Sequence, residues 1–328
     1  MSEGCTVAEI LQRVRKRRKD ASSVLTLSER PLRFEALSTG LLPIDFILAG
    51  GWPKGRICQV YGETSSGKTS LALATVAATQ KKGFPCGYID MEHTLDPAWA
   101  AKLGVEIDNL IISQPNCGEE ALEVAADLIE EGTALVVVDS VPALVTEQEL
   151  KGEVTDSSIA PQARMLSQYL RRMIPVISDR EAVLLFINQK RVKMMMYTPG
   201  DAIPGGSALQ FYSSVILRLS RRLPREDGCI DIIARVTKHK LAPPFKEATV
   251  RLYFDRGFDK VDLLATQAIA SEVVVRRGAF YYFGDLKFQG RDALVAALNE
   301  DTTLFADIEQ EVLNAFPRHS EHTDESTD

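Results

Sequence analysis

The chain has 328 residues, 45% of them hydrophobic, and a formal net charge of −7. Its length and apolar content predict one major domain with a smaller one. Its acidic balance excludes a globally basic nucleic-acid binder, so any DNA contact must come from local basic patches. No run of about 18 apolar residues and no apolar N-terminal signal core occur, which argues against a membrane span and against secretion.

Cysteine and histidine usage indicates a reducing compartment. The five cysteines are widely scattered and never form a C-x-x-C pair, and the four histidines show no metal-ligand spacing. This usage favours free thiols in the cytoplasm over a disulfide framework or a zinc site. The cysteines are Cys5, Cys58, Cys86, Cys117 and Cys229.

A helix with a basic end is predicted for residues 6–19, ahead of the main domain. Thr6 and Glu9 have the spacing of a capping box, and apolar residues recur on one narrow face. We expect this helix to pack on a neighbouring subunit. Its basic end, residues 13–19, is either a solvated face or a contact for acidic protein or DNA.

A strand, a glycine loop and a helix then follow in succession. Residues 57–61 form a short apolar run, residues 70–76 continue as a helix, and the loop between them fits G-x-x-x-x-G-K-[ST]. Such a loop closes its backbone N–H groups on a polyphosphate at the positive end of the helix. We expect Lys68 to reach the β- and γ-phosphates of a nucleoside triphosphate, and the Thr69 hydroxyl to ligate Mg²⁺. The loop and the first helical residue are Gly62, Glu63, Thr64, Ser65, Ser66, Gly67, Lys68, Thr69 and Ser70.

From residue 34 onward, apolar strands alternate with amphipathic helices. This alternation predicts an α/β fold with a mostly parallel sheet that is buried on both faces. Ligands of such sheets bind beyond the carboxyl ends of the strands. Strands are predicted at 86–90, 134–138 and 182–187, and helices at 69–82, 97–103, 118–131 and 161–178.

Three predicted strands each end in a polar residue that is able to act at that edge. We expect Asp139 to hold Mg²⁺ through water, and Glu92 to polarise the attacking water. Gln189 is expected to hydrogen-bond the γ-phosphate and to report its presence to the segment that follows. The alternative role for Glu92 is a surface salt bridge.

These stretches closely resemble the bacterial RecA recombinase family. The resemblance rests on the glycine loop and on Asp90-Met91-Glu92-His93-Thr94-Leu95-Asp96-Pro97, and it continues through 137–141, 186–189 and 238–245. It runs in order from about Leu37 to Phe316. It implies a RecA-type P-loop ATPase core with an N-terminal helix and a small α+β C-terminal domain.

The resemblance further implies a DNA-dependent ATPase of recombination and DNA repair. Such a protein forms a helical homo-oligomeric filament on single-stranded DNA and exchanges strands with a homologous duplex, using ATP and Mg²⁺. A repressor protein and loader proteins are further candidate partners. By the same resemblance, Glu92 is the catalytic glutamate and Gln189 is the γ-phosphate switch.

The remaining ATP-site residues also come from the resemblance. Asp96 matches an aspartate that contacts adenine, and Trp99 stands where the family usually has a tyrosine stacked on the base. Lys238 and Lys240 resemble a pair that reaches across a subunit boundary to the neighbour's ATP, where cations stabilise transition-state charge. Without the family, these two lysines would be interpreted as a solvated face.

Two loops are expected to hold the DNA. The first spans about 149–161, and the second spans 190–206. Because the second loop begins directly after Gln189, ATP binding is expected to control DNA binding through this residue. Cations can pair with phosphates while methionines wedge between bases; a buried methionine patch is the alternative. The DNA-binding candidates are Ile159, Arg164, Ser167, Arg171, Arg191, Lys193, Met194, Gly205, Gly206 and Ser207.

The C-terminal part resembles the small C-terminal domain of the family. We predict a short helix at 268–277, an aromatic hairpin at 278–288, and two helices within 290–316. Its cations Arg276, Arg277, Lys287 and Arg291 either contact duplex DNA or only solubilise the domain. Residues 318–328 are predicted to be a disordered acidic tail with a mild autoinhibitory role. The expected domains are therefore 1–33, 34–264 and 265–317, followed by this tail.

Departures from the family fall at DNA-contacting and interface positions and spare the ATP site. Gln210 stands where a lysine is usual at the subunit interface, and Asp201 replaces a glutamate. The loops differ at Ile159, Ala160, Pro199 and Pro204. The loop changes favour a rival function, a paralogue that forms an ATP-controlled structural or regulatory DNA filament without strand exchange. The intact Glu92 and Gln189 disfavour this rival, so the recombinase remains the first hypothesis. A hexameric helicase-like motor is disfavoured, because the long N-terminal domain and linker of such motors are not found.

Overall fold

The computed structural model describes residues 6–18, 24–29, 34–151, 159–192, 201–202, 206–223 and 228–316. The chain divides into two units, Met1–Phe34 and Glu35–Asp328. In the described part of the chain, no helix is long and apolar enough to cross a membrane.

The first unit contains α1 (Val7–Arg17) and the short 3-10 turn η2 (Leu27–Glu29). The predicted capping box is confirmed: the Thr6 N–H donates to Glu9 Oε2 at 3.0 Å, and the Glu9 N–H donates to Thr6 Oγ1 at 3.3 Å. No residue of α1 is buried, and Val7 is 71% exposed. The apolar face of α1 is therefore open within its own unit.

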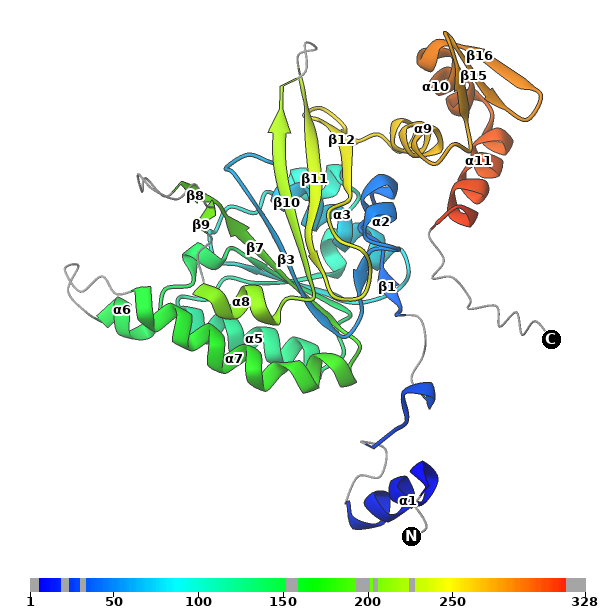
Figure 1. Cartoon of the computed structure of the whole chain (residues 1–328). Helices are drawn as coiled ribbons and strands as arrows, with labels where there is room; N and C mark the ends of the chain where they lie inside the picture. The colour runs from blue at the N-terminus through cyan, green and yellow to red at the C-terminus, as the bar shows by residue number, and fades with distance from the viewer. Residues whose placement is uncertain are drawn as a thin grey trace, which may run out of the picture. The chain divides into compact units, whose positions relative to one another are not determined.

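The second unit is built on a nine-stranded sheet in the order β13-β12-β11-β10-β3-β7-β6-β4-β5 (Figure 1). The strands from β10 to β5 are parallel, whereas β11, β12 and β13 extend the sheet in antiparallel fashion. The strands are β3 (Arg56–Gly62), β4 (Cys86–Asp90), β5 (Leu110–Ser113), β6 (Leu135–Asp139), β7 (Val183–Gln189), β10 (Val215–Arg222), β11 (Cys229–His239), β12 (Glu247–Tyr253) and β13 (Gly257–Phe258). The predicted α/β class and mostly parallel sheet are confirmed.

Helices cover both faces of this sheet. On one face α3 (Lys68–Gln80) packs against β3 and β6 and α2 (Leu42–Ile47) packs against β12, and these helices bury Leu73 and Ile44. On the other face α5 (Gly118–Glu130), α7 (Ile159–Asp179) and α8 (Gly206–Tyr212) bury Leu122, Leu170 and Leu209. Because both faces are packed, the central strands β6 and β7 are apolar until they reach the edge of the sheet, where they end in polar residues.

Several shorter elements connect these layers. Two-residue strands pair as β1 (Ala36–Leu37) with β2 (Trp52–Pro53), and as β8 (Arg191–Val192) with β9 (Asp201–Ala202). The other connecting elements are α4 (Pro97–Lys102), η3 (Ile107–Asn109), η4 (Val141–Ala143) and α6 (Glu147–Lys151).

The predicted bounds of both DNA loops were too wide. The first loop was expected to span 149–161, but residues 149–151 belong to α6 and residues 159–161 begin α7. The second was expected to span 190–206, but it contains the β8–β9 pair, and α8 begins at Gly206. Lys193, Met194, Pro199, Pro204 and Gly205 lie outside the described residues, as does the acidic tail.

The C-terminal part has its own core. Leu264 and Ala268 of α9 (Lys260–Ala270) pack with α10 (Gly290–Glu300) and α11 (Thr302–Asn314), beside the sheet β14 (Val275–Arg277), β15 (Phe280–Phe283) and β16 (Leu286–Gln289). The predicted aromatic hairpin and two final helices are confirmed. The helix predicted at 268–277 is wrong, because Asp259 caps α9 earlier and Glu272, at φ 59°, leaves the helical region. The domain boundary expected after residue 264 falls inside α9.

Candidate functional site

The glycine loop joins β3 to α3, and its backbone is tightly packed. Gly67 has φ 85°, and a Cβ there would lie 2.3 Å from Ile232 Cδ1. A Cβ on Gly62 would lie 2.3 Å from the Leu219 carbonyl oxygen, so both glycines are required by close approach. Ser66 Oγ is buried in this loop and has no hydrogen-bond partner among the described residues. An unsatisfied hydroxyl in such a cradle fits a loop that is completed by an anionic ligand.

Lys68 folds back onto the loop that carries it. Its Nζ donates to the carbonyl oxygens of Glu63 at 2.7 Å and Gly62 at 3.5 Å, and the side chain is buried. Burial lowers the pKa of Lys68, while the carboxylates of Asp139 and Glu92 oppose that shift. Both acids therefore act on the lysine, as expected in a site that gathers charges around a phosphate.

Asp139 ends β6 beside the start of α3. Its Oδ2 accepts hydrogen bonds from Thr69 Oγ1 at 2.9 Å and from the Tyr88 hydroxyl at 2.7 Å. Burial raises the pKa of Asp139, and the two hydroxyl donors counter that effect. The structure thus brings together the two predicted Mg²⁺ residues, Thr69 and Asp139, and adds Tyr88, which the sequence interpretation missed.

Glu92 and Gln189 meet at the ends of β4 and β7. Gln189 Nε2 donates to Glu92 Oε1 at 3.1 Å, and Ser140 Oγ also donates to that oxygen. In the described part of the chain Glu92 forms no ion pair, so the salt-bridge alternative receives no support. Asp90 accepts from the Thr94 and Leu95 N–H groups and from Gln114 Nε2, and these bonds fix the turn that carries Glu92.

Asp96 and Trp99 lie at the start of α4. Asp96 caps this helix by accepting from the Ala98 N–H at 2.8 Å. The Trp99 indole N–H donates to Ser70 Oγ at 3.2 Å, and Lys102 Nζ lies 5.6 Å from the ring centroid. Trp99 is therefore tied to the first turn of α3, beside the glycine loop.

Lys238 and Lys240 both bind the carboxyl end of α8 in this single chain. Lys238 Nζ donates to the carbonyl oxygens of Gln210 at 2.6 Å and Phe211 at 3.2 Å. Lys240 Nζ donates to those of Phe211 at 3.1 Å and Tyr212 at 3.5 Å. Burial, and then the nearby Lys240, lowers the pKa of Lys238. Among the described residues, neither lysine contacts the glycine loop.

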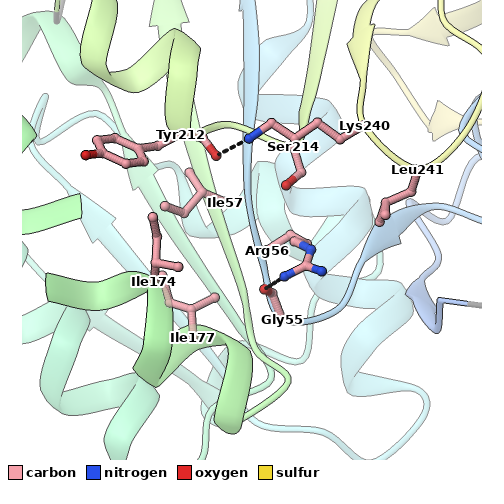
Figure 2. A pocket seen from close by; sticks show the side chains of 9 residues that line it. All are labelled: Gly55, Arg56, Ile57, Ile174, Ile177, Tyr212, Ser214, Lys240 and Leu241. Carbon is pink, nitrogen blue, oxygen red and sulfur yellow. Dashed lines mark hydrogen bonds between the residues drawn. The ribbon is translucent and has the colours of Figure 1, made fainter. Parts of the chain in front are cut away.

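A pocket of about 200 Å³ lies next to Lys240 (Figure 2). It opens at the amino end of β3, whereas the glycine loop follows the carboxyl end of that strand, so this pocket is distinct from the nucleotide site. Its lining is Gly55, Arg56, Ile57, Ile174, Ile177, Tyr212, Ser214, Lys240 and Leu241.

The DNA-binding candidates of α7 share the face opposite its core residues. Arg164 and Arg171 are exposed and Ser167 is half-buried, whereas Leu166 and Leu170 are fully buried. Ile159 is the first residue of α7, and Arg191 lies in β8. Gly206 and the exposed Ser207 begin α8, and a Cβ on Gly206 would lie 3.0 Å from Ala163 Cβ of α7.

The C-terminal cations separate into two kinds. Arg276, Arg277 and Lys287 lie over aromatic rings of the hairpin, at 5.8, 5.5 and 4.0 Å from the centroids. Arg291 instead donates to Thr266 Oγ1 at 2.9 Å and pairs with Asp262 Oδ1 at 2.7 Å. Arg291 therefore joins α10 to α9, while the other three remain surface cations on a small sheet.

The cradle, its lysine, and the acids at the ends of neighbouring strands define a P-loop nucleoside triphosphatase. The model of the "RecA N-terminal domain" matches residues 6–259. "Protein RecA" of Clostridium botulinum (strain Eklund 17B / Type B) is 42% identical over 299 residues, covering 88% of this chain and 84% of that protein. "Protein RecA" of Thermus thermophilus is 39% identical over 301 residues, covering 89% of this chain and 88% of that protein.

A solved structure gives an independent likeness of fold. The crystal structure of the RadB recombinase matches with a TM-score of 0.53 at 24% identity, covering 67% of this chain and 97% of that one. The chain belongs to the bacterial RecA recombinase family. It is a DNA-dependent ATPase of homologous recombination and repair, and the family assignment favours this function over the non-recombining paralogue.

Proposed function

We propose that this chain hydrolyses ATP at the glycine loop and couples the nucleotide state to a DNA filament that performs homologous pairing and strand exchange. The observation that carries the proposal is the hydrogen-bonded cluster at the strand ends. Glu92 accepts a hydrogen bond from Gln189, Asp139 accepts one from Thr69, and both acids act electrostatically on Lys68. The glycine loop thus lies beside three groups that hydrolysis would need. These groups are an acid that polarises water, an amide that senses the γ-phosphate, and a pair of residues that bind the metal.

Thr69 and Asp139 would hold Mg²⁺, Asp139 through water. One hydroxyl and one carboxylate offer the hard oxygen ligands that this ion prefers, and both lie at the amino end of α3. When bound, the ion neutralises charge on the β- and γ-phosphates. Lys68 would exchange the Glu63 carbonyl for phosphate oxygens, and the loop N–H groups would bind the remaining charge. Asp96 and Trp99, fixed beside Ser70, would contact the adenine.

Gln189 links this chemistry to the second DNA loop. Its amide donates to Glu92, and a γ-phosphate oxygen would compete for the same N–H group. The next residue, Lys190, donates its backbone N–H to the carbonyl oxygen of Gly62 at 2.9 Å. The start of the second DNA loop is therefore hydrogen-bonded to the first residue of the glycine loop. A change of partner at Gln189 would therefore be transmitted to Arg191 and the residues that follow.

Lys238 and Lys240 would complete the neighbouring subunit's ATP site. In one chain their ammonium groups bind the carboxyl end of α8, where the helix dipole stabilises cations. Each lysine would have to leave these carbonyls to reach a neighbour's phosphates. Full hydrolytic activity would then require assembly into a filament.

The DNA would run along the exposed face of α7 and the second loop. Arg164 and Arg171 offer cations on one helix face, and Gly206 brings α8 close to that helix. Arg276, Arg277 and Lys287 would contact duplex DNA through the C-terminal sheet, where Arg291 has a structural role instead. We also propose that unit 1 supplies a helix for packing on a neighbouring subunit, because its apolar face is open.

Steady-state ATP hydrolysis tests the proposal, measured with and without single-stranded DNA over a range of protein concentrations. We expect strong stimulation by DNA that rises cooperatively with protein concentration, because each site needs a neighbour. A Lys68→Ala variant is the control for contaminating ATPases. Hydrolysis that is indifferent to DNA and linear in protein concentration would contradict the coupled filament.

A further inference from the structure

Tyr88 is a buried residue at the nucleotide site that lies outside the set of predicted site residues. It lies in the middle of β4 with none of its surface exposed. In the β4–β6 register, Tyr88 is opposite Val137 and thus diagonal to Asp139, two residues further along β6. This diagonal brings the phenol to Asp139 Oδ2 at 2.7 Å, on the oxygen that also accepts from Thr69 at 2.9 Å.

The phenol can only serve as a hydrogen-bond donor here. A carboxylate only accepts hydrogen bonds, so the donor in this contact is the Tyr88 hydroxyl. It has one proton, and it donates that proton to Asp139. Within the described chain, Asp139 Oδ2 therefore has two hydroxyl donors, whereas Oδ1 accepts no hydrogen bond.

We propose that Tyr88 is a positioning residue of the Mg²⁺ site, which fixes Asp139 with Oδ1 available to a metal-bound water. The Thr69 hydroxyl can donate to Asp139 while a lone pair of its oxygen binds the ion, but one hydrogen bond leaves the carboxylate free to turn about it. Tyr88 adds a second donor to the same oxygen, which restricts that rotation. Outer partners of this kind orient metal-binding groups and tune their affinity. The inference depends on the proposed assignment of Mg²⁺ to Thr69 and Asp139.

Another buried tyrosine shows why the hydroxyl of Tyr88 is informative. The Tyr169 hydroxyl in α7 is also buried, but it has no hydrogen-bond partner among the described residues. A phenylalanine would fill either space, and a buried hydroxyl costs desolvation unless it is bonded. Removal of the hydroxyl therefore breaks a hydrogen bond at Tyr88 but none at Tyr169. Tyr88→Phe and Tyr169→Phe are thus a matched pair, in which Tyr169→Phe is the control.

The test uses the full chain without DNA and a fluorescent ATP analogue. The affinity for the analogue is measured first in EDTA, and MgCl₂ is then titrated to find the concentration that gives half of the metal-dependent tightening. The wild type, Tyr88→Phe and Tyr169→Phe are compared, and the titration is repeated with Mn²⁺, followed by its electron paramagnetic resonance signal.

We expect Tyr88→Phe to need about tenfold more Mg²⁺ and Mn²⁺, with its affinity in EDTA unchanged and Tyr169→Phe equal to the wild type. An unchanged metal requirement in Tyr88→Phe would overturn the inference. So would an equal loss of affinity in EDTA, because it would mean that Tyr88 only supports the fold. Failure of the wild type to bind the analogue under any condition would refute the proposed function itself, and the inference with it.

Discussion

Asp45 of α2 is a buried acid whose charge should make the stability of the protein depend on pH. It is 6% exposed and accepts from the Thr39 N–H at 2.6 Å and from Ser38 Oγ. Burial raises the pKa of Asp45 from 3.8 to about 6, although these hydrogen bonds lower it in part. The turn that it holds packs on α3, since a Cβ on Gly40 would lie 2.8 Å from the Ala74 carbonyl oxygen.

The sign of the effect follows from the raised pKa. Between pH 4 and pH 6 the folded chain binds a proton at Asp45 that the unfolded chain does not, so the free energy of unfolding falls as pH rises through this window. The full contribution is about 3 kcal/mol, and about 1 kcal/mol of it separates pH 5 from pH 8. An Asp45→Asn variant carries no such charge and should lose this part of the pH dependence.

Urea unfolding of the wild type and Asp45→Asn at pH 5 and pH 8 measures the effect. We expect the difference in unfolding free energy, wild type minus variant, to be larger at pH 5 by about 1 kcal/mol. Asp285→Asn, which removes the same charge from an exposed turn, is the matched control. A pH-independent difference between the wild type and Asp45→Asn would refute the reasoning.

Three further predictions concern function. Glu92→Gln should keep ATP and DNA binding but lower kcat by about 100-fold or more, measured as DNA-stimulated hydrolysis; retained turnover would mean that another group positions the water. Lys238→Ala should lower hydrolysis by about 1000-fold in assembled protein and leave the residual activity of dilute, unassembled subunits unchanged, so an equal loss in both would argue against a role across the subunit boundary. Truncation at Pro317 should tighten DNA binding severalfold at low salt and have less effect at high salt, because an acidic tail competes electrostatically; unchanged affinity at low salt would count against autoinhibition.

Local patterns predicted several residues that the structure places close together beside the glycine loop. The glycine loop, Asp139, Glu92 and Gln189 were found because each ends or follows an apolar strand, and parallel strands bring their ends together. Tyr88 could not be found in this way, because its contact depends on the diagonal register between β4 and β6. Strand β5 was missed for a related reason, since this edge strand leaves Ile111 and Ile112 about half exposed and is only four residues long.

The C-terminal helix shows a different limit of sequence interpretation. A helix was predicted at residues 268–277, whereas in the structure the helix begins at Lys260 and ends at Ala270. Capping decided the outcome, because Asp259 accepts from the N–H groups of Val261 and Asp262. For Lys238 and Lys240, no local pattern indicated that both would bind the end of α8, since that contact joins segments 28 residues apart.

The position of α8 has a thermodynamic consequence. Its first residue approaches α7, where the DNA-binding candidates lie, and its last carbonyls hold the two lysines proposed for the neighbour's ATP. If DNA displaces the end of α8, the lysines are released toward the next subunit, and if a neighbour captures the lysines, α8 loses the groups that held it. By linkage, the factor by which DNA strengthens subunit contact must equal the factor by which subunit contact strengthens DNA binding. A short helix would thus set a single coupling free energy between DNA binding and subunit association. A subunit would then join the filament and bind DNA in one cooperative step.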